Sequence, residues 1–411
     1  MFSNNLILKF IAVFLTYGQT LILARLLTVA EFGLFSTLLA TVNIFCTACL
    51  FGFPQLIQRN YRRHDDIAAL QSASYLWVNI SIILTAVLVI TTNFIGQTLI
   101  QVSFLVSIFC ISIVRLKAHE LFGKGFLIAG QCADILLRPL LLIVLLLIYV
   151  YFEGSLISSN IFIIFTISCF LASMLLRLPI FNIRKGWSID FRHLNEFFIY
   201  WRQGLPFFLI SLVQILAINI WIILISHFQD SSEAGVFRIS FVICLAFGLL
   251  REIIDMISRN KIIDVYLGKA GEGSKVINEV SRTYFLGAIV LVFGFSIYLA
   301  WGESIITKVF GSQYTQVFLI SIPLVLARIF ECLLGPFPIY IQVNGHEKTA
   351  VLISWCAFIV SIAFYAGSYE KLGLMSASIG FLIYTVVVRV SSYVIYKLSQ
   401  IQKALISNER L

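Results

Sequence analysis

Charged side chains occur inside stretches of this sequence that are otherwise apolar, and several of them stand at helical spacing. Asp134 precedes Arg138 by four residues and Arg328 precedes Glu331 by three, so each pair would share one face of a helix. A charge at the centre of a bilayer costs about 2.5–3.5 kcal/mol on insertion scales, so it needs a partner or a water-filled cavity. An arginine guanidinium presents a planar fork of donors that matches phosphate oxygens. These faces therefore predict an aqueous cavity that binds an anionic ligand.

The candidate binding residues are four cations within or at the ends of apolar stretches: Lys9, Arg25, Arg138 and Arg238. The candidate carboxylates are Asp134, Glu252, Asp255 and Glu331. Arg389 stands near the end of an apolar stretch, and we interpret it as a side chain that extends to the lipid headgroups.

A structural interpretation of the same charges stays open. Asp134 with Arg138, Arg251 with Asp255, and Arg328 with Glu331 would be self-neutralising pairs that only fix helix packing. Polar faces occur, however, in four apolar stretches drawn from both halves of the chain. Packing alone does not require that distribution, which favours a shared aqueous path.

Patterns for metal binding, disulfides and covalent catalysis are weak. All eight cysteines lie in or at the ends of apolar stretches, so we expect no disulfides. Cys46 and Cys49 have CxxC spacing without a second cysteine pair or a nearby histidine, so we expect no metal site. Since no nucleophile stands with a base, we expect neither enzymatic activity nor a cofactor. The net charge of +9 is spread over many short connections, so we expect no nucleic-acid partner.

The elements that must position these charges are membrane-spanning helices. The 411 residues are 60% hydrophobic and 12% charged, with a mean hydropathy of +0.98, which leaves too little polar surface for a water-soluble globule. A helical span needs about 20 apolar residues, and we expect no cleaved signal peptide before the first. Twelve spans are predicted, at residues 5–27, 33–58, two within 67–114, 130–150, 154–176, 204–229, 235–257, 283–302, 316–340, 349–369 and 372–398.

Lysine and arginine are concentrated in the connections after the second, fourth, sixth and eighth spans. Because positive loops stay inside, both termini are predicted to be cytoplasmic. The residues concerned are Arg59, Arg62 and Arg63; Arg115, Lys117 and Lys124; Arg184, Lys185, Arg192 and Arg202; and Arg259, Lys261, Lys269, Lys275 and Arg282.

A duplicated motif predicts two lobes. Glu31, Gly33 and Phe35 stand in the order acidic-x-Gly-x-Phe, which residues 233–237 repeat, and Arg-Asn ends the apolar stretch after each copy. We expect Glu31 and Gly33 to be architectural. The predicted fold is all-α, with about 12 transmembrane helices in two pseudo-repeated six-helix lobes around a central cavity. The predicted boundaries are residues 1–181 for the first lobe, 182–203 for a cytoplasmic interfacial linker and 204–411 for the second lobe.

Glycine and proline mark three candidate hinges. They stand at residues 52–54, 204–206 and 335–338, inside or at the ends of spans, where they free backbone hydrogen-bonding groups.

The chain resembles the polysaccharide or O-antigen (Wzx-type) flippases of the multidrug/oligosaccharidyl-lipid/polysaccharide exporter superfamily. The matching residues occur in the family's order, although Thr28 replaces a usual glycine and no proline ends the eighth span. They are residues 24–35, 136–140, 234–237, 309–314, 344–348 and 372–378.

The resemblance implies alternating access that moves an undecaprenyl-diphosphate-linked oligosaccharide across the bacterial inner membrane. The four cations would meet the diphosphate, and the four carboxylates would balance charge or couple a proton or sodium gradient. The implied partners are the lipid-linked oligosaccharide, membrane lipids and polysaccharide polymerase machinery. Two rivals remain: a multidrug/cation antiporter of the same superfamily, which would favour an acidic cavity, and a membrane polysaccharide polymerase, which would need a long outside loop.

Overall fold

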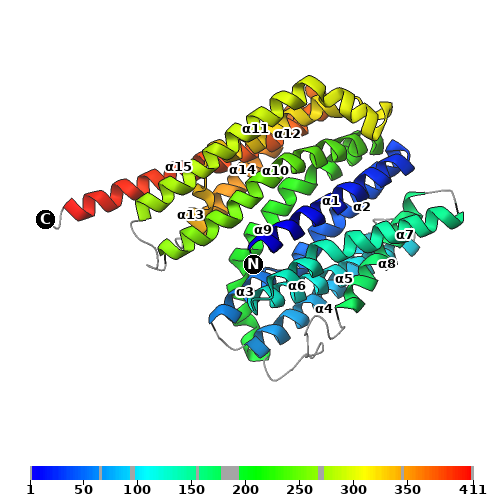
Figure 1. Cartoon of the computed structure of the whole chain (residues 1–411). Helices are drawn as coiled ribbons and strands as arrows, with labels where there is room; N and C mark the ends of the chain where they lie inside the picture. The colour runs from blue at the N-terminus through cyan, green and yellow to red at the C-terminus, as the bar shows by residue number, and fades with distance from the viewer. Residues whose placement is uncertain are drawn as a thin grey trace. The chain divides into compact units, whose positions relative to one another are not determined.

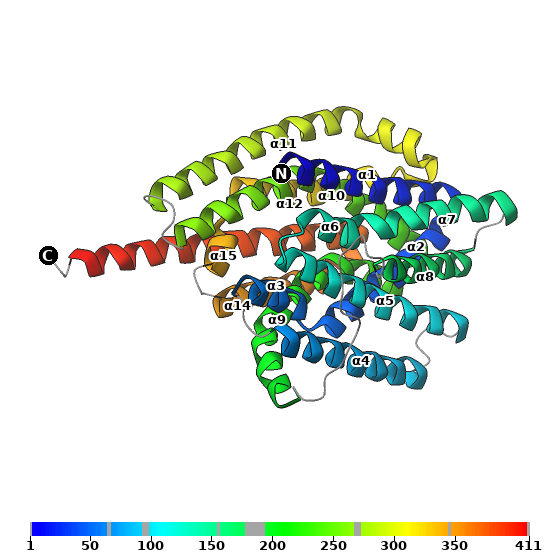
Figure 2. The same ribbon diagram turned by 60° about the horizontal axis from the view of Figure 1, so that its bottom comes forward.

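The computed structural model describes residues 2–63, 67–92, 98–153, 157–176, 194–266, 273–343 and 347–408, and at some helical residues it describes the backbone alone (Figures 1 and 2). Every regular element in these ranges is a helix. Within the described ranges, ten helical segments are long and apolar enough to cross a membrane, one of them made of α6 (Leu127–Gln131), η1 (Cys132–Leu136) and α7 (Leu137–Glu153) together, and the chain is a multi-pass membrane protein. The two other predicted spans correspond to α1, Phe2–Leu26, and α12, Val317–Leu333. The arrangement of twelve helices in two lobes stays a prediction.

The chain divides into two compact units, Met1–Gly235 (unit 1) and Val236–Leu411 (unit 2). Besides α1, unit 1 contains α2 (Val29–Leu50), α3 (Phe53–Arg63), α4 (Ile67–Thr92), α5 (Thr98–Gly123), α6 (Leu127–Gln131), the π-helical segment η1 (Cys132–Leu136), α7 (Leu137–Glu153), α8 (Ser158–Leu175) and α9 (Leu194–Phe228). Unit 2 contains most of α10 (Ser231–Tyr266), then α11 (Gly273–Phe310), the 3-10 turn η4 (Ser312–Tyr314), α12, α13 (Phe337–Val343), α14 (Glu347–Leu372) and α15 (Leu374–Asn408).

The predicted lobes differ from these units in the place of α9. The sequence assigns residues 204–229 to the second lobe, whereas α9 packs within unit 1, beside α2. Residues 182–193 of the predicted linker lie outside the described residues, and residues 194–203 form the first turns of α9. The predicted lobes are defined by the duplicated sequence motif, whereas the two units are defined by packing. The lobe boundaries therefore stay a prediction.

The first candidate hinge is a break between two helices. The predicted span at residues 33–58 is wrong as a single helix, because α2 ends at Leu50 and α3 begins at Phe53. Phe51 has left-handed backbone angles, with φ 43° and ψ 35°, and its ring stacks on Trp201 and Phe208 of α9 with centroids 4.9 and 4.5 Å away. Since such a backbone conformation costs a non-glycine residue free energy, the aromatic contacts of α9 stabilise this turn.

The other two candidate hinges differ from each other. α9 continues through Pro206, so no break occurs there, because a proline removes only one hydrogen bond from a long helix. Residues 334–336 form a turn between α12 and α13, in which Gly335 has a φ of 75°.

The first copy of the duplicated motif organises the packing of unit 1, as expected. Thr28 begins α2 by accepting a hydrogen bond from the Glu31 amide at 3.3 Å, and a Glu31 carboxylate oxygen accepts from the amide of Ser158, at the start of α8, at 2.6 Å. Gly33 lies directly against the backbone of Ser231 and Gly235, leaving no room for a Cβ. The two motif copies therefore meet through their glycines.

α5 is longer than predicted, and it contributes two residues to the cavity described below. Arg115 and Lys117 lie inside it and not in a connection, because no glycine or proline interrupts residues 98–122. Glu120 pairs with Lys117 and Lys124 at 3.1 and 2.6 Å, and the Tyr61 hydroxyl of α3 donates to it at 3.2 Å. Burial, and then the charge of Glu120, raises the pKa of Tyr61 above its ordinary value. α8 lies beside α5 and α7 in both views (Figures 1 and 2).

Candidate functional site

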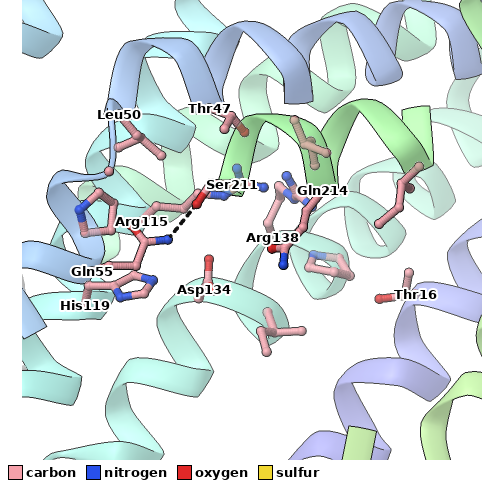
Figure 3. A pocket seen from close by; sticks show the side chains of 16 residues that line it. Thr16, Thr47, Leu50, Gln55, Arg115, His119, Asp134, Arg138, Ser211 and Gln214 are labelled. Atoms are coloured by element: carbon pink, nitrogen blue, oxygen red, sulfur yellow. Dashed lines mark hydrogen bonds between the residues drawn. The ribbon is translucent and has the colours of Figure 1, made fainter. Parts of the chain in front are cut away.

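Unit 1 contains a cavity of about 460 Å³, lined by α1, α2, α3, α5, η1, α7 and α9 (Figure 3). This volume lies within the range of about 300–1,000 Å³ that is typical of small-molecule sites. Its walls differ in chemistry. One wall carries all the charged side chains that line it in the described part of the chain, and the other is neutral, with polar and apolar side chains side by side.

The charged wall is built by α5, η1 and α7. Arg115 and His119 are one helical turn apart on α5, Asp134 lies in η1, and Arg138 lies in the first turn of α7. With two arginines and one carboxylate, the described lining has a formal charge of +1 when His119 is neutral (two minus one). This wall therefore suits an anion.

The guanidinium groups of Arg115 and Arg138 are each held by a different neighbouring helix. Arg115 Nη2 donates to Asn43 Oδ1 of α2 at 3.4 Å, and the Arg138 guanidinium carbon lies 5.7 Å from the centre of the Phe165 ring of α8. Neither contact neutralises charge, so both arginines keep their full charge toward the cavity.

The π-helical segment separates Asp134 from Arg138. Leu137 donates its amide hydrogen to the carbonyl of Cys132, five residues back, and Pro139 has no N–H to give to the carbonyl of Ile135. Because this turn contains more residues than an α-helical turn, Arg138 does not lie directly above Asp134 on the same helix face. No ion pair joins Asp134 to Arg138 within 4.0 Å among the described side chains. The α-helical pairing expected from their spacing is therefore wrong. Figure 3 shows both side chains pointing toward the same space.

The neutral wall is built by α3 and α9. Gln55 Nε2 donates to Ser211 Oγ at 3.1 Å, the dashed line of Figure 3, and thereby links the two helices. Gln214, three residues after Ser211, is exposed to the cavity. Thr16 and Thr47 complete the polar lining, with their hydroxyls donating to carbonyls of their own helices.

Four charged residues of unit 2 form a network in which two side chains are buried and two are half-buried. Glu331 accepts from Arg328 at 2.8 Å and from Arg251 at 2.7 Å, and Arg251 also pairs with Asp255 at 2.8 Å. The Tyr284 hydroxyl donates to Asp255 as well. Arg328 and Glu331 are each only 7% exposed. The predicted pairs Arg251–Asp255 and Arg328–Glu331 are confirmed, and their mutual neutralisation agrees with the structural interpretation of these charges.

The remaining predicted residues are not brought together in the cavity. Arg25 is exposed at the end of α1, and Arg238 and Glu252 are half-buried on α10. Lys9 belongs to α1, but its side chain lies outside the described part of the structure. Arg138 and Asp134 are the two predicted residues that line the cavity.

The interpretation of Arg389 as a side chain that reaches the headgroups is wrong. It is 7% exposed and donates to the carbonyl of Gly335 at 2.7 Å. That carbonyl lies in the turn between α12 and α13, where the helical hydrogen-bond ladder is interrupted. The arginine therefore satisfies a backbone acceptor inside unit 2.

Sequence reasoning missed Arg115 and His119 as cavity residues because it placed this segment in a cytoplasmic connection. The uninterrupted helical pattern of residues 98–122 could have revealed them, since one turn separates them on one face. In the described part of the chain, no three His, Cys, Asp or Glu side chains are grouped closely enough to hold a metal ion.

Comparison with protein families identifies a family. A family model described as "Polysaccharide biosynthesis protein" matches residues 22–319. A comparison with curated protein sequences finds no match.

Comparison with solved structures shows the fold. The chain is similar to the lipid II flippase MurJ in an inward closed conformation, with a TM-score of 0.75, 13% identity, and coverage of 97% of this chain and 87% of that one. It is similar to an inward-facing multidrug resistance MATE family transporter of the MOP superfamily (TM-score 0.67, 17% identity, coverage 94% and 96%). It is also similar to a point mutant of the Vibrio cholerae MATE transporter VcmN (TM-score 0.66, 14% identity, coverage 99% and 97%).

Proposed function

Because the chain belongs to the polysaccharide biosynthesis protein family, we propose that it flips an undecaprenyl-diphosphate-linked oligosaccharide, an O-antigen or capsule repeat unit, across the bacterial inner membrane. The family match, together with the folds of MATE transporters and of a lipid II flippase, confirms the resemblance seen in the sequence.

The observation that carries this proposal is the pair of arginines in the cavity of unit 1. Arg115 and Arg138 come from different helices, line one space, and are opposed there by the single carboxylate of Asp134 among the described lining residues. A diphosphate diester is an acceptor-only anion, and two guanidinium groups supply the donors and the charge that it requires.

The wider proposal follows the family resemblance. Twelve helices in two lobes would alternate between inward and outward access, with both termini in the cytoplasm. Transport would be coupled to a proton or sodium gradient and would involve no covalent chemistry and no cofactor. Polysaccharide polymerase machinery would receive the flipped product. Arg25, Arg238 and Lys9 stay proposed contacts of the diphosphate, and Glu252, Asp255 and Glu331 stay proposed groups for charge balance or coupling.

A multidrug/cation antiporter is the second candidate, because MATE transporters share this fold. A cationic cargo would be repelled by the net positive lining of the cavity. The antiporter therefore predicts efflux of a cationic dye, and the flippase predicts none.

A flipping assay in proteoliposomes tests the proposal. Arg115→Gln and Arg138→Gln should each slow translocation of a fluorescent diphosphate-linked saccharide about 10- to 100-fold, the range of one hydrogen bond to a charged group. Arg202→Gln is the matched control, because Arg202 is exposed on α9 and does not line the cavity. Wild-type rates in both cavity variants, with a functioning control, would overturn the proposal.

A further inference from the structure

We propose that the neutral wall of the cavity binds the sugar residue bonded to the diphosphate, with Gln55 and Gln214 as specificity-determining residues. This inference rests on the proposed function, since it presupposes a diphosphate at the charged wall.

The chemistry of the neutral wall differs from what a phosphate requires. Phosphate oxygens only accept hydrogen bonds, so a site for phosphate alone gains nothing from additional acceptors. Gln55, Ser211 and Gln214 line this wall, and each side chain has an acceptor oxygen as well as a donor, although the Gln55 oxygen is buried. Sugar hydroxyls also donate and accept, so this wall complements a carbohydrate.

The Gln55 amide is held in place and incompletely satisfied. Its Nε2 donates to Ser211 Oγ at 3.1 Å, while its buried Oε1 has no hydrogen-bond partner among the described residues. A buried acceptor without a donor is costly and calls for an explanation. Turning the terminal amide toward the cavity would let a ligand hydroxyl beside Ser211 supply that donor, and Gln214 on the next turn of α9 would offer a second contact (Figure 3).

The size of the cavity limits what it can recognise. A volume of about 460 Å³ accommodates one ligand of small-molecule size, so the diphosphate and one adjoining sugar share it. More distant sugars and the polyprenyl chain must lie outside this cavity. Selectivity at this wall is therefore for the proximal sugar.

Two matched probes test the inference with the full-length protein in detergent. One is geranyl diphosphate bearing N-acetylglucosamine, and the other bears a methyl group in place of the sugar. The dissociation constant of the methyl probe divided by that of the sugar probe measures the contribution of the sugar, because the contributions of the diphosphate and the lipid cancel. We expect wild type to bind the sugar probe more tightly, and Gln214→Leu and Gln55→Leu each to reduce the ratio about 2- to 10-fold, the range of one neutral hydrogen bond.

Two controls separate this inference from the proposed function. Gln203→Leu, an exposed position on the same α9 helix, should keep the wild-type ratio. Arg138→Gln should weaken both probes and leave the ratio unchanged. If Gln214→Leu does not fold, Gln214→Asn replaces it, because its shorter amide should also lose the sugar contact.

Two results would overturn the inference. An unchanged ratio in the Gln55 and Gln214 variants, whether or not both probes bind more weakly, removes the sugar site while the diphosphate site stands. If Arg115→Gln and Arg138→Gln do not weaken the methyl probe, the proposed function fails, and the inference fails with it.

Discussion

Gly33→Ala should destabilise unit 1, because a single methyl group has no room where the two motif copies meet. A Cβ on Gly33 would overlap the carbonyl oxygen of Ser231, which is backbone and cannot rotate away as a side chain can. Overpacking of this kind costs about 1–3 kcal/mol. With about 2.1 cal/mol/K of unfolding entropy per residue, a cooperative unit covering Met1–Gly235 should lose about 2–6 °C of melting temperature.

Gly18→Ala is the matched control. Gly18 lies inside α1, and no neighbouring atom lies within 4 Å of the place its Cβ would take. Because alanine is the better helix former, the free energy of unfolding of this variant should equal that of wild type or exceed it by about 0.5–1 kcal/mol.

The buried cysteines supply the assay. Cys46, Cys49, Cys110 and Cys169 are buried in unit 1, so a thiol-reactive fluorophore reports its unfolding as the temperature rises. One scan rate should serve all variants, since thermal midpoints of irreversible transitions depend on it. A Gly33→Ala midpoint at or above that of wild type would refute the close approach of the two glycine motifs.

Three further substitutions have defined outcomes. Asp134→Asn removes the sole carboxylate of the described cavity lining, so affinity for the methyl diphosphate probe should rise about 2- to 10-fold in a titration, and an unchanged affinity would contradict its place beside the anion. Glu331→Gln leaves Arg251 and Arg328 without their shared carboxylate, which costs about 3–5 kcal/mol, so the midpoint of unit 2, reported by its buried Cys244 and Cys332, should fall further than that of unit 1 in Gly33→Ala, and a smaller fall would argue against this network. Phe51→Gly should be about 1 kcal/mol more stable than Phe51→Ala in the thiol assay, because glycine accepts the left-handed backbone, and equal midpoints would exclude that strain.

Local relations along the chain were predictable from the sequence. Apolar length identifies the membrane spans because the bilayer fixes how many residues a helix needs to cross it. The Arg328–Glu331 and Arg251–Asp255 pairs follow from helical spacing, since both lie on unbroken helices. The architectural roles of Glu31 and Gly33 follow from their recurrence in a duplicated motif.

Helical spacing in the sequence did not predict the structure where the helix is irregular. Asp134 and Arg138 do not pair, because η1 changes the number of residues in the turn between them. The span predicted at residues 33–58 is two helices, because the left-handed turn at Phe51 depends on rings of α9 that are far away in sequence. Local preference alone would not place a phenylalanine there.

The sequence by itself determined that the chain is a helical membrane protein, that its membrane segments carry charge, and that arginine is the residue suited to an anion. Only the tertiary structure decided which charges are neutralised and which face open space. Arg251 of α10 pairs with Glu331 of α12, whereas Arg115 and Arg138 form no ion pair within 4.0 Å among the described side chains and share a cavity with Asp134, Gln55 and Gln214. The physical reason is that burial cost and charge pairing depend on neighbours in space, and helices distant in sequence supply those neighbours.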